Sequence, residues 1–396
     1  MAQALPDSAA PSVAHAAVAG VEQELRRLAD PVDKGECAPA LVYDTIRASG
    51  LLAALVPVDR GGMGLSFAEY TSMLCALGSA NGSAALGFNM HNVALGSLFE
   101  ADPADLGGAG RAFREWVVHE VVERGALFAS GVSEPATGAR LQGIATVYRN
   151  VGDRVVLDGH KSFVSLAGVA DYYVVSARPA DGDDFEVSHF VVAASDPGVS
   201  FADEWNGIAL RGTSTAQLTM RSTEIPRDRL FLGVEGMSLF KTIREPHWMA
   251  AGYLGAYLGL ATAIVEVAGA HLDADQRRRT DSAAVAQFGE MVVALEATRS
   301  LVQRAAAAVV TRRSQTSTNK LVYAAKHHLG QTAQHLASDA VRLIGSAAMA
   351  ADKPMQRLLR EVQFCAIMPA KPHHCLDYVG KASLGENMLD VRNQNW

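Results

Sequence analysis

The segment that indicates the fold most directly spans residues 160–178 and reads HKSFVSLAGVADYYVVSAR. A short polar start leads through a Gly/Ala turn into a run of β-branched and aromatic residues, which predicts two strands joined by a turn. Ser165 is an isolated hydroxyl at the end of the first of these strands. The chemical question that the segment raises is what this hydroxyl contacts.

Similar short runs continue on both sides of this segment. From residue 127 to residue 233 they alternate with Gly, Asp, Asn and Pro, as in IATVYRN (144–150), VSHFVVAA (187–194) and AQLTMRSTEI (216–225). Strand-forming runs of this length, separated by turn residues, are typical of a compact antiparallel sheet. We therefore predict a central β-domain over residues 127–233.

The flanking regions have the three- and four-residue apolar spacing of helices. Residues 1–126 are predicted to form an N-terminal α-helical domain. Residues 234–396 are predicted to form a C-terminal four-helix bundle. Its long helices are expected at 248–272, 282–313, 319–349 and 354–366. The fold class is therefore α+β.

Composition excludes several classes of protein. The 396 residues carry a formal net charge of −7 without a long Lys/Arg block, which argues against nucleic-acid binding. The four cysteines have no CxxC spacing and the N-terminus lacks a secretory pattern, so we expect a cytoplasmic protein. The apolar run at 249–265 is shorter than the ~20 residues needed to cross a bilayer, and we expect a buried helix and no membrane partner.

Generic catalytic motifs are missing from the sequence. It contains no phosphate-binding loop, no GxGxxG after a strand, no HExxH and no GxSxG. The adjacent pairs His327-His328 and His373-His374 do not face one another on a helix, so neither predicts a metal site.

Longer segments carry a resemblance to a known family. SGVSEPATGARLQG (130–143), the segment 157–177 and WNGIALRGTSTAQL (205–218) resemble the β-domain signature of the acyl-CoA dehydrogenase superfamily, and RLIGSAAM (342–349) with PMQRLLREV (354–362) resembles its last bundle helices. The resemblance covers nearly the whole chain. It implies a flavin between the β-domain and the bundle, and a homotetramer.

The resemblance also assigns candidate flavin contacts. It places Ser165 beside flavin N5, Ser133 as a second hydroxyl near the ring, and Trp205 at the flavin edge. Gln287 of AQFGEM (286–291) and Gly345 of RLIGSAAM are further cofactor-binding candidates. Serine suits N5 because a hydroxyl both donates and accepts hydrogen bonds.

A dehydrogenase of this family needs a carboxylate base over the flavin. One family position for that Glu holds Pro369, and the other holds Met249 when the chain is aligned on LGLA (258–261). A second alignment, on Leu254 and Gly255, places Glu245 there instead. Glu245 therefore stays open as a catalytic base, although the Pro246 that follows is also typical of a helix start.

Two further departures concern ligand binding. The family Ser near the substrate thioester is Ala139, and the Arg-x-x-Phe pair that grips the adenosine part of FAD is missing from residues 273–287. Either FAD or FMN is therefore compatible with the sequence.

His91, in FNMHNVALG (88–96), offers different chemistry. Flavin monooxygenases on this fold carry a His in this helix and a Ser on the strand, and the chain is most similar in its motifs to the amino-sugar nitrososynthases. The resemblance implies reduced flavin (FAD or FMN), O₂, a flavin C4a-hydroperoxide, and His91 and Ser165 as hydrogen-bond donors.

A separate reductase is implied because the chain has no nicotinamide-binding motif. The expected reaction is oxidation of a small-molecule heteroatom, most specifically an amine nitrogen. The alternatives are an acyl-CoA or acyl-carrier-protein dehydrogenase with Glu245 as base, and a binding or scaffold subunit that holds no flavin.

Overall fold

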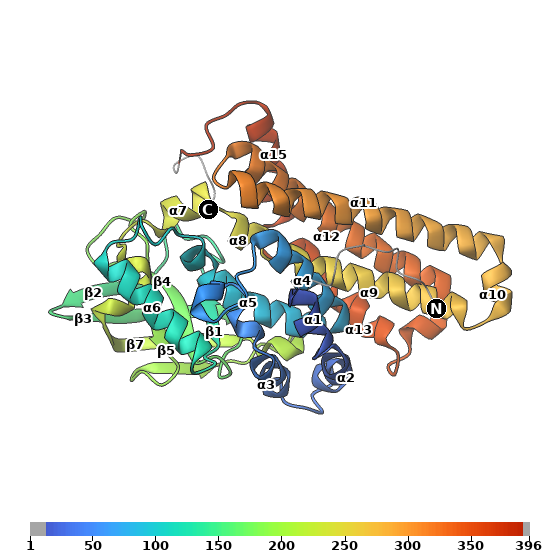
Figure 1. Ribbon diagram of the computed structural model, residues 1–396, viewed down its shortest axis with the longest axis horizontal. Coiled ribbons are helices and arrows are strands. Elements are labelled where there is room, and N and C mark those ends of the chain that lie inside the picture. Colours follow the sequence, from blue (N-terminus) through green and yellow to red (C-terminus); the bar gives the residue numbers. More distant parts are fainter. Residues whose placement is uncertain (1–12, 391–396) are drawn as a thin grey trace.

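The computed structural model describes residues 13–390, which form two helical regions with a β-region between them (Figure 1). The N-terminal helices are α1 (Val13–Ala19), α2 (Glu22–Asp33), α3 (Ala40–Ala48), α4 (Phe67–Ala80), α5 (Gly82–Phe99) and α6 (Gly108–Val122). Local sequence fixes the start of α4, because Ser66 and Glu69 form a reciprocal capping box. Helix α5 is apolar on nearly every side and is buried along most of its length.

The strands form one mixed sheet. They are β1 (Phe128–Gly131), β2 (Val147–Val151), β3 (Arg154–Val164), β4 (Tyr172–Pro179), β5 (Ser188–Ala193), β6 (Val199–Ala202) and β7 (Ala216–Pro226). The order is β1-β4-β2-β3-β7-β6, with β5 paired to β4. The pairings β1–β4 and β2–β4 are parallel, and the other four are antiparallel. The sequence predicts an antiparallel sheet, and the structure differs from this at β4. Strands β1 and β2 follow one another along the same edge of β4, and both run parallel to it.

The C-terminal region contains α7 (Ser238–Arg244), α8 (His247–Ala250), α9 (Leu254–Asp273), α10 (Gln276–Thr280), α11 (Ser282–Arg312), α12 (Thr316–Ile344), α13 (Pro354–Glu361), α14 (Gln363–Ile367) and α15 (Pro372–Ser383). Its three long helices lie side by side, and α4 packs along α9 (Figure 1). The close approach of α4 and α9 requires glycine: a Cβ on Gly255 would lie 2.5 Å from the Thr71 carbonyl oxygen.

Three predicted helix boundaries are wrong. The helix expected at 248–272 is divided, since the Ala251 and Gly252 N–H groups both donate to the His247 carbonyl and close α8. The helix expected at 319–349 ends at Ile344, because Gly345 has φ 79° and a 3₁₀ turn follows. The helix expected at 354–366 is divided at Val362.

One segment, His247–Asp273, is long and apolar enough to cross a membrane by length and composition alone. In the structure 89% of its most apolar window is buried inside the protein. It therefore occupies the position of a core helix.

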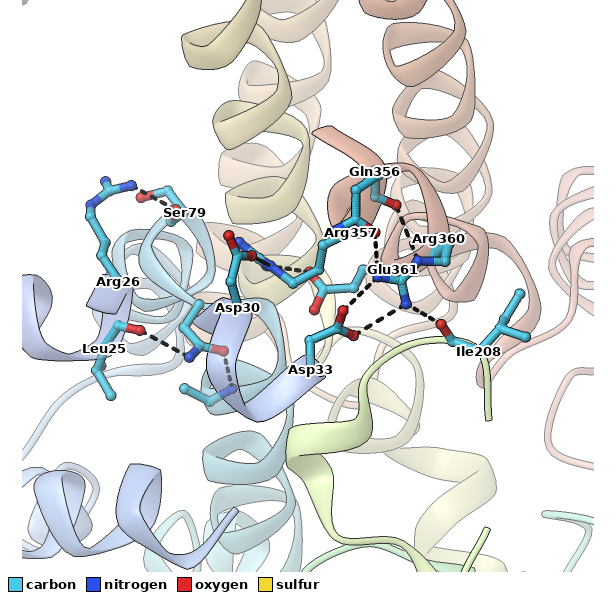
Figure 2. A network of polar contacts seen from close by, with 12 residues as sticks. Leu25, Arg26, Asp30, Asp33, Ser79, Ile208, Gln356, Arg357, Arg360 and Glu361 are labelled. Atoms are coloured by element: carbon cyan, nitrogen blue, oxygen red, sulfur yellow. Dashed lines mark hydrogen bonds and ion pairs between the residues drawn. The ribbon is translucent and has the colours of Figure 1, made fainter. Parts of the chain in front are cut away.

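A network of ion pairs joins the N-terminal region to the bundle and to a loop of the β-region (Figure 2). Arg357 on α13 lies 2.6 Å from Asp30 on α2, and Arg360 lies 2.5 Å from Asp33. Arg360 also donates to the carbonyl oxygen of Ile208, in the loop between β6 and β7. This network fixes the loop that carries Trp205 against the bundle.

Candidate functional site

A cavity of about 670 Å³ lies where the three regions meet. Its size is within the range of small-molecule sites. Residues from α5, from the loop after β1, from the end of β3, from α8 and from the segment after α14 line it, among them Met90, Ser133, Thr137, Arg140, Phe163, Ser165, Met249, Pro369 and Lys371. We call it the Ser165 cavity.

Backbone contacts hold the two predicted hydroxyl residues on this wall. The N–H of Ser162 donates to the Ser133 carbonyl at 2.8 Å, which joins the end of β3 to the loop after β1. The N–H of Leu166 donates to the Thr213 carbonyl at 2.8 Å. The structure therefore brings Ser133 and Ser165 together on one cavity, and their contact with a flavin stays a prediction.

A buried ion pair lies behind this wall. The Lys161 Nζ donates to a Glu134 oxygen at 2.7 Å, and both side chains are almost fully buried. Burial alone would raise the pKa of Glu134, but Lys161 and hydrogen bonds from Thr146 and Ala145 hold it below its ordinary value. The pair connects β3 to the Ser133 loop.

Phe163 is the residue that sequence reasoning missed. Its side chain is 65% exposed, its φ is 53°, and it lines the Ser165 cavity. Trp205, which we predicted at the flavin edge, does not line that cavity. It lies beside a smaller cavity with Thr213 and Thr215 and contacts the Phe163 ring edge-on. The signal for Phe163 was its place in the strand motif, two residues before Ser165.

A second cavity of about 300 Å³ adjoins the first and shares Val93, Ser130, Val132 and Met249 with it. We call it the Glu245 cavity. Most of its wall is apolar, but Lys241, Glu245 and His189 also line it. Burial, with the charges of Lys161 and Lys241, lowers the pKa of His189 to about 4, and its Nε2 has no hydrogen-bond partner among the described residues. The cavity therefore offers both an uncharged imidazole and a carboxylate to a bound molecule.

Glu245 is held within a cluster of charged groups. Its Oε1 accepts a hydrogen bond from Ser314 at 2.5 Å and lies 4.0 Å from Arg313 Nε. Arg313 also pairs with Glu100, which in turn contacts His247. Glu245 lines the second cavity but not the Ser165 cavity.

The position of His91 contradicts its predicted role as a donor in the site. Its Nε2 lies 2.9 Å from the Leu52 carbonyl oxygen, and its Nδ1 accepts from the Phe128 N–H at 3.0 Å. Burial lowers its pKa to about 4, and it lines neither cavity. His91 is a core residue that links α5, the turn at residues 51–53 and β1, because both ring nitrogens are used by the backbone.

The residues of the Ser165 cavity fit a flavin. The wall presents two hydroxyls and an exposed aromatic ring, and Arg140 and Lys371 bring positive charge suited to a phosphate. The buried Thr137 Oγ1 on the same wall has no partner within the described residues. An orphaned polar atom of this kind is typical of a site completed by a ligand.

Family models match three parts of the chain: the N-terminal domain of acyl-CoA dehydrogenases at residues 12–101, the middle domain at 129–223 and the C-terminal domain at 246–369. The chain belongs to the acyl-CoA dehydrogenase family. The predicted class, an oxidoreductase on this fold, is confirmed.

Relatives within the family include enzymes of two kinds. Amino sugar nitrososynthase DnmZ of Streptomyces peucetius is 24% identical over 89% of this chain and 88% of its own length. The mitochondrial short-chain specific acyl-CoA dehydrogenase of Homo sapiens is 26% identical over 87% of this chain and 83% of its own length. The solved structure of KijD3 with FMN and dTDP-3-amino-2,3,6-trideoxy-4-keto-3-methyl-D-glucose has a TM-score of 0.84, with 24% identity and 98% coverage of both chains.

The residues that the alignment on LGLA assigns to the two base positions both lie on a cavity wall. Pro369 lines the Ser165 cavity, and Met249 lines both cavities. Neither side chain can take up a proton. In that alignment neither base position holds a base; in the alignment on Leu254 and Gly255 the second position is Glu245, which lines the Glu245 cavity.

Gln287 and Gly345 lie away from both cavities in the single chain. The Gln287 amide donates to the Asp339 carbonyl at 3.3 Å, and Gly345 closes α12. Their roles in cofactor binding stay predictions.

Proposed function

We propose that the protein is a monooxygenase that uses reduced flavin and O₂ to oxidise a heteroatom of a small molecule, most specifically an amine nitrogen. The observation that carries the proposal is the wall of the Ser165 cavity. It presents hydroxyls and an aromatic ring suited to a flavin, together with Pro369 and Met249. The family resemblance, aligned on LGLA, assigns the dehydrogenase base to those two positions. A reduced flavin would supply electrons to O₂ and deliver one oxygen atom to the substrate.

The residues of this chain would bind and orient the flavin and the substrate, and would exclude water from the site. Ser133, Ser165 and Phe163 would hold the flavin ring, and Arg140 and Lys371 would hold its phosphate. The mostly apolar Glu245 cavity would hold the substrate beside it and exclude water. Within that cavity, the uncharged His189 and the Glu245 carboxylate are suited to hydrogen bonds with an amine.

Nitrososynthase relatives support the finer proposal of an amino-sugar substrate. A separate reductase would deliver the reduced flavin, as FMN or FAD. We further propose a cytoplasmic homotetramer. The exposed Val285, Val293 and Val310 on α11 support coverage of that helix by another subunit.

The test uses protein loaded anaerobically with reduced FMN and mixed with isotopically labelled O₂ and a panel of amines that includes a nucleotide-linked amino sugar. We expect labelled oxygen on the amine nitrogen, found by mass spectrometry. Ser165→Ala should give mainly hydrogen peroxide. Glu245→Gln keeps an acceptor oxygen but loses the charge, so it should raise the amine concentration needed for half-maximal turnover and still give labelled product at saturating amine. Absence of label in every product would contradict the proposal.

The dehydrogenase alternative has one observation in its favour, since Glu245 lines the cavity next to Met249. It predicts that an acyl thioester bleaches the oxidised flavin without O₂, and that Glu245→Gln abolishes bleaching. A protein that binds no flavin in either redox state would favour the scaffold alternative.

A further inference from the structure

Three buried hydroxyls form a row that begins at the cavity wall. Ser165 Oγ lies 3.3 Å from Thr215 Oγ1, and Thr215 Oγ1 lies 2.8 Å from Thr213 Oγ1. The row ends where Thr213 donates to the carbonyl oxygen of Leu210 at 2.8 Å. The exposed fractions of Ser165, Thr215 and Thr213 are only 6%, 8% and 2%, so the three side chains are largely shielded from bulk water.

The carbonyl at the end of the row fixes the direction of every hydrogen in it. A carbonyl oxygen only accepts, and a hydroxyl has a single hydrogen to donate. The Thr213 hydrogen is used by Leu210, so Thr215 must donate to Thr213. The Thr215 hydrogen is then used as well, so Ser165 must donate to Thr215. Ser165 therefore presents lone pairs to the cavity and has no hydrogen left to donate there.

The backbone around the row holds this arrangement in place. The N–H of Ala167 donates to the Ser214 carbonyl at 2.8 Å, and the Ser214 hydroxyl donates back to the Ala167 carbonyl at 3.0 Å. Four non-glycine residues beside the row have a left-handed backbone, which side chains rarely adopt: Phe163, Leu166, Leu210 and Ser214. Strained backbone of this kind persists where the surrounding structure determines it and is concentrated at functional sites.

We propose that Thr213 and Thr215 are positioning residues that hold Ser165 as a hydrogen-bond acceptor, so that the site binds reduced flavin more tightly than oxidised flavin. Reduced flavin carries a hydrogen on N5, which an acceptor can bind. Oxidised flavin has only a lone pair on N5, which would face the lone pairs of Ser165 unfavourably in the orientation that the family resemblance implies. The inference rests on the proposed function, which places a flavin in the Ser165 cavity. It goes further by assigning selection of the redox state to two residues outside the cavity wall.

The experiment measures the dissociation constants of reduced and oxidised FMN, anaerobically and by equilibrium dialysis, for the full-length protein and its variants. We expect the native protein to favour reduced FMN. Thr215→Val should lower the ratio of the two affinities about three- to tenfold, the factor typical of one hydrogen bond. Thr213→Val should lower it as well, because Thr215 can then donate to Ser165 and free the Ser165 hydrogen for the cavity.

One control variant keeps the hydroxyl at position 215, and the other removes a hydroxyl that lies outside the row. Thr215→Ser preserves the row and should retain the native ratio. Thr223→Val removes a buried hydroxyl on β7 that has no hydrogen-bond partner among the described residues, and should leave the ratio unchanged. Circular dichroism of each variant checks that it is folded.

A Thr215→Val ratio equal to the native one, in a protein that still binds FMN, would overturn the inference and leave the proposed function standing. Failure of the native protein to bind FMN or FAD in either state would overturn both. Ser165→Ala gives an independent reading if the valine variants do not fold. It should weaken binding of reduced FMN more than that of oxidised FMN, and the opposite order would show that Ser165 donates.

Discussion

The Phe163 ring lies edge-on to the indole of Trp205, with 6.2 Å between the ring centroids and 78° between the planes. Trp205 contacts Phe364 on α14 in the same manner, at 5.5 Å and 81°. The three rings thus connect the exposed wall of the Ser165 cavity to the bundle. Edge-to-face contacts of this kind stabilise the orientation of the rings.

This relationship predicts different effects for two substitutions. Phe163→Ala should weaken FMN binding about tenfold in either redox state, because it removes an aromatic surface from the cavity wall. Trp205→Phe, which keeps an aromatic support, should weaken it less than threefold by the same conversion. Equilibrium dialysis measures both. A larger loss for Trp205→Phe would mean that the indole itself contacts the flavin.

The strands and the two hydroxyls were predictable because their signal is local. The family resemblance of their motifs implied that Ser133 and Ser165 lie near one flavin ring, and in the structure both line the Ser165 cavity. His91 was not predictable in this way. Helix α5 is apolar on nearly every side, so its sequence does not indicate which face meets the cavity. Only the backbone of β1 and of residues 51–53 shows that both His91 nitrogens are used.

Contacts between residues far apart in the chain were also not predictable from the sequence. The parallel contact of β1 with β4 joins residues more than forty positions apart in the chain, and alternation within a strand says nothing of its partner. The helix break at 251–253 is closed by the N–H groups of Ala251 and Gly252, which both donate to the His247 carbonyl, and apolar spacing does not indicate such contacts. The pairing of Glu245 with Ser314 likewise appears only when α7 and α11 are brought together.

The buried pair of Glu134 and Lys161 should be a strong determinant of stability. Lys161→Met leaves the Glu134 carboxylate buried without a countercharge, and should lower the free energy of unfolding by about 3–5 kcal/mol. Urea unfolding followed by circular dichroism measures the loss. The double variant Glu134→Gln with Lys161→Met should recover part of it, because the uncompensated charge is then removed.

The matched control is Arg149→Met, since Arg149 pairs with Asp158 on the surface. Its loss should stay below about 1 kcal/mol. If Lys161→Met and Arg149→Met lower the free energy of unfolding equally, the burial of the pair of Glu134 and Lys161 contributes nothing.

Arg360 should control the mobility of the loop that holds Trp205. It joins Asp33 to the Ile208 carbonyl (Figure 2). Arg360→Met should raise hydrogen exchange of the amides at residues 203–214 about tenfold, because local opening becomes easier by about the free energy of one charged hydrogen bond. Arg27→Met, which removes only an exposed pair with Glu24 on α2, should leave that exchange unchanged. Unaltered exchange in both variants would mean that the loop is held by other contacts.

His91 should make stability depend on pH. Folded His91 stays neutral down to about pH 4, because burial lowers its pKa to about 4. The unfolded chain takes up that proton near pH 6.5, the ordinary value for His. Between these values the unfolded state binds more protons, so the free energy of unfolding falls as the pH falls, by up to about 3 kcal/mol from this residue.

His91→Gln removes this titration. Relative to the native protein it should be less stable at about pH 7, where the native imidazole bonds two backbone groups, and the difference should shrink steadily toward about pH 4.5. Urea unfolding across that interval measures it. The exposed His335→Gln serves as the control for replacing a histidine outside the core. A constant gap between native and His91→Gln would mean that His91 takes up its proton alike in the folded and unfolded chain, and that it is not sealed in the core.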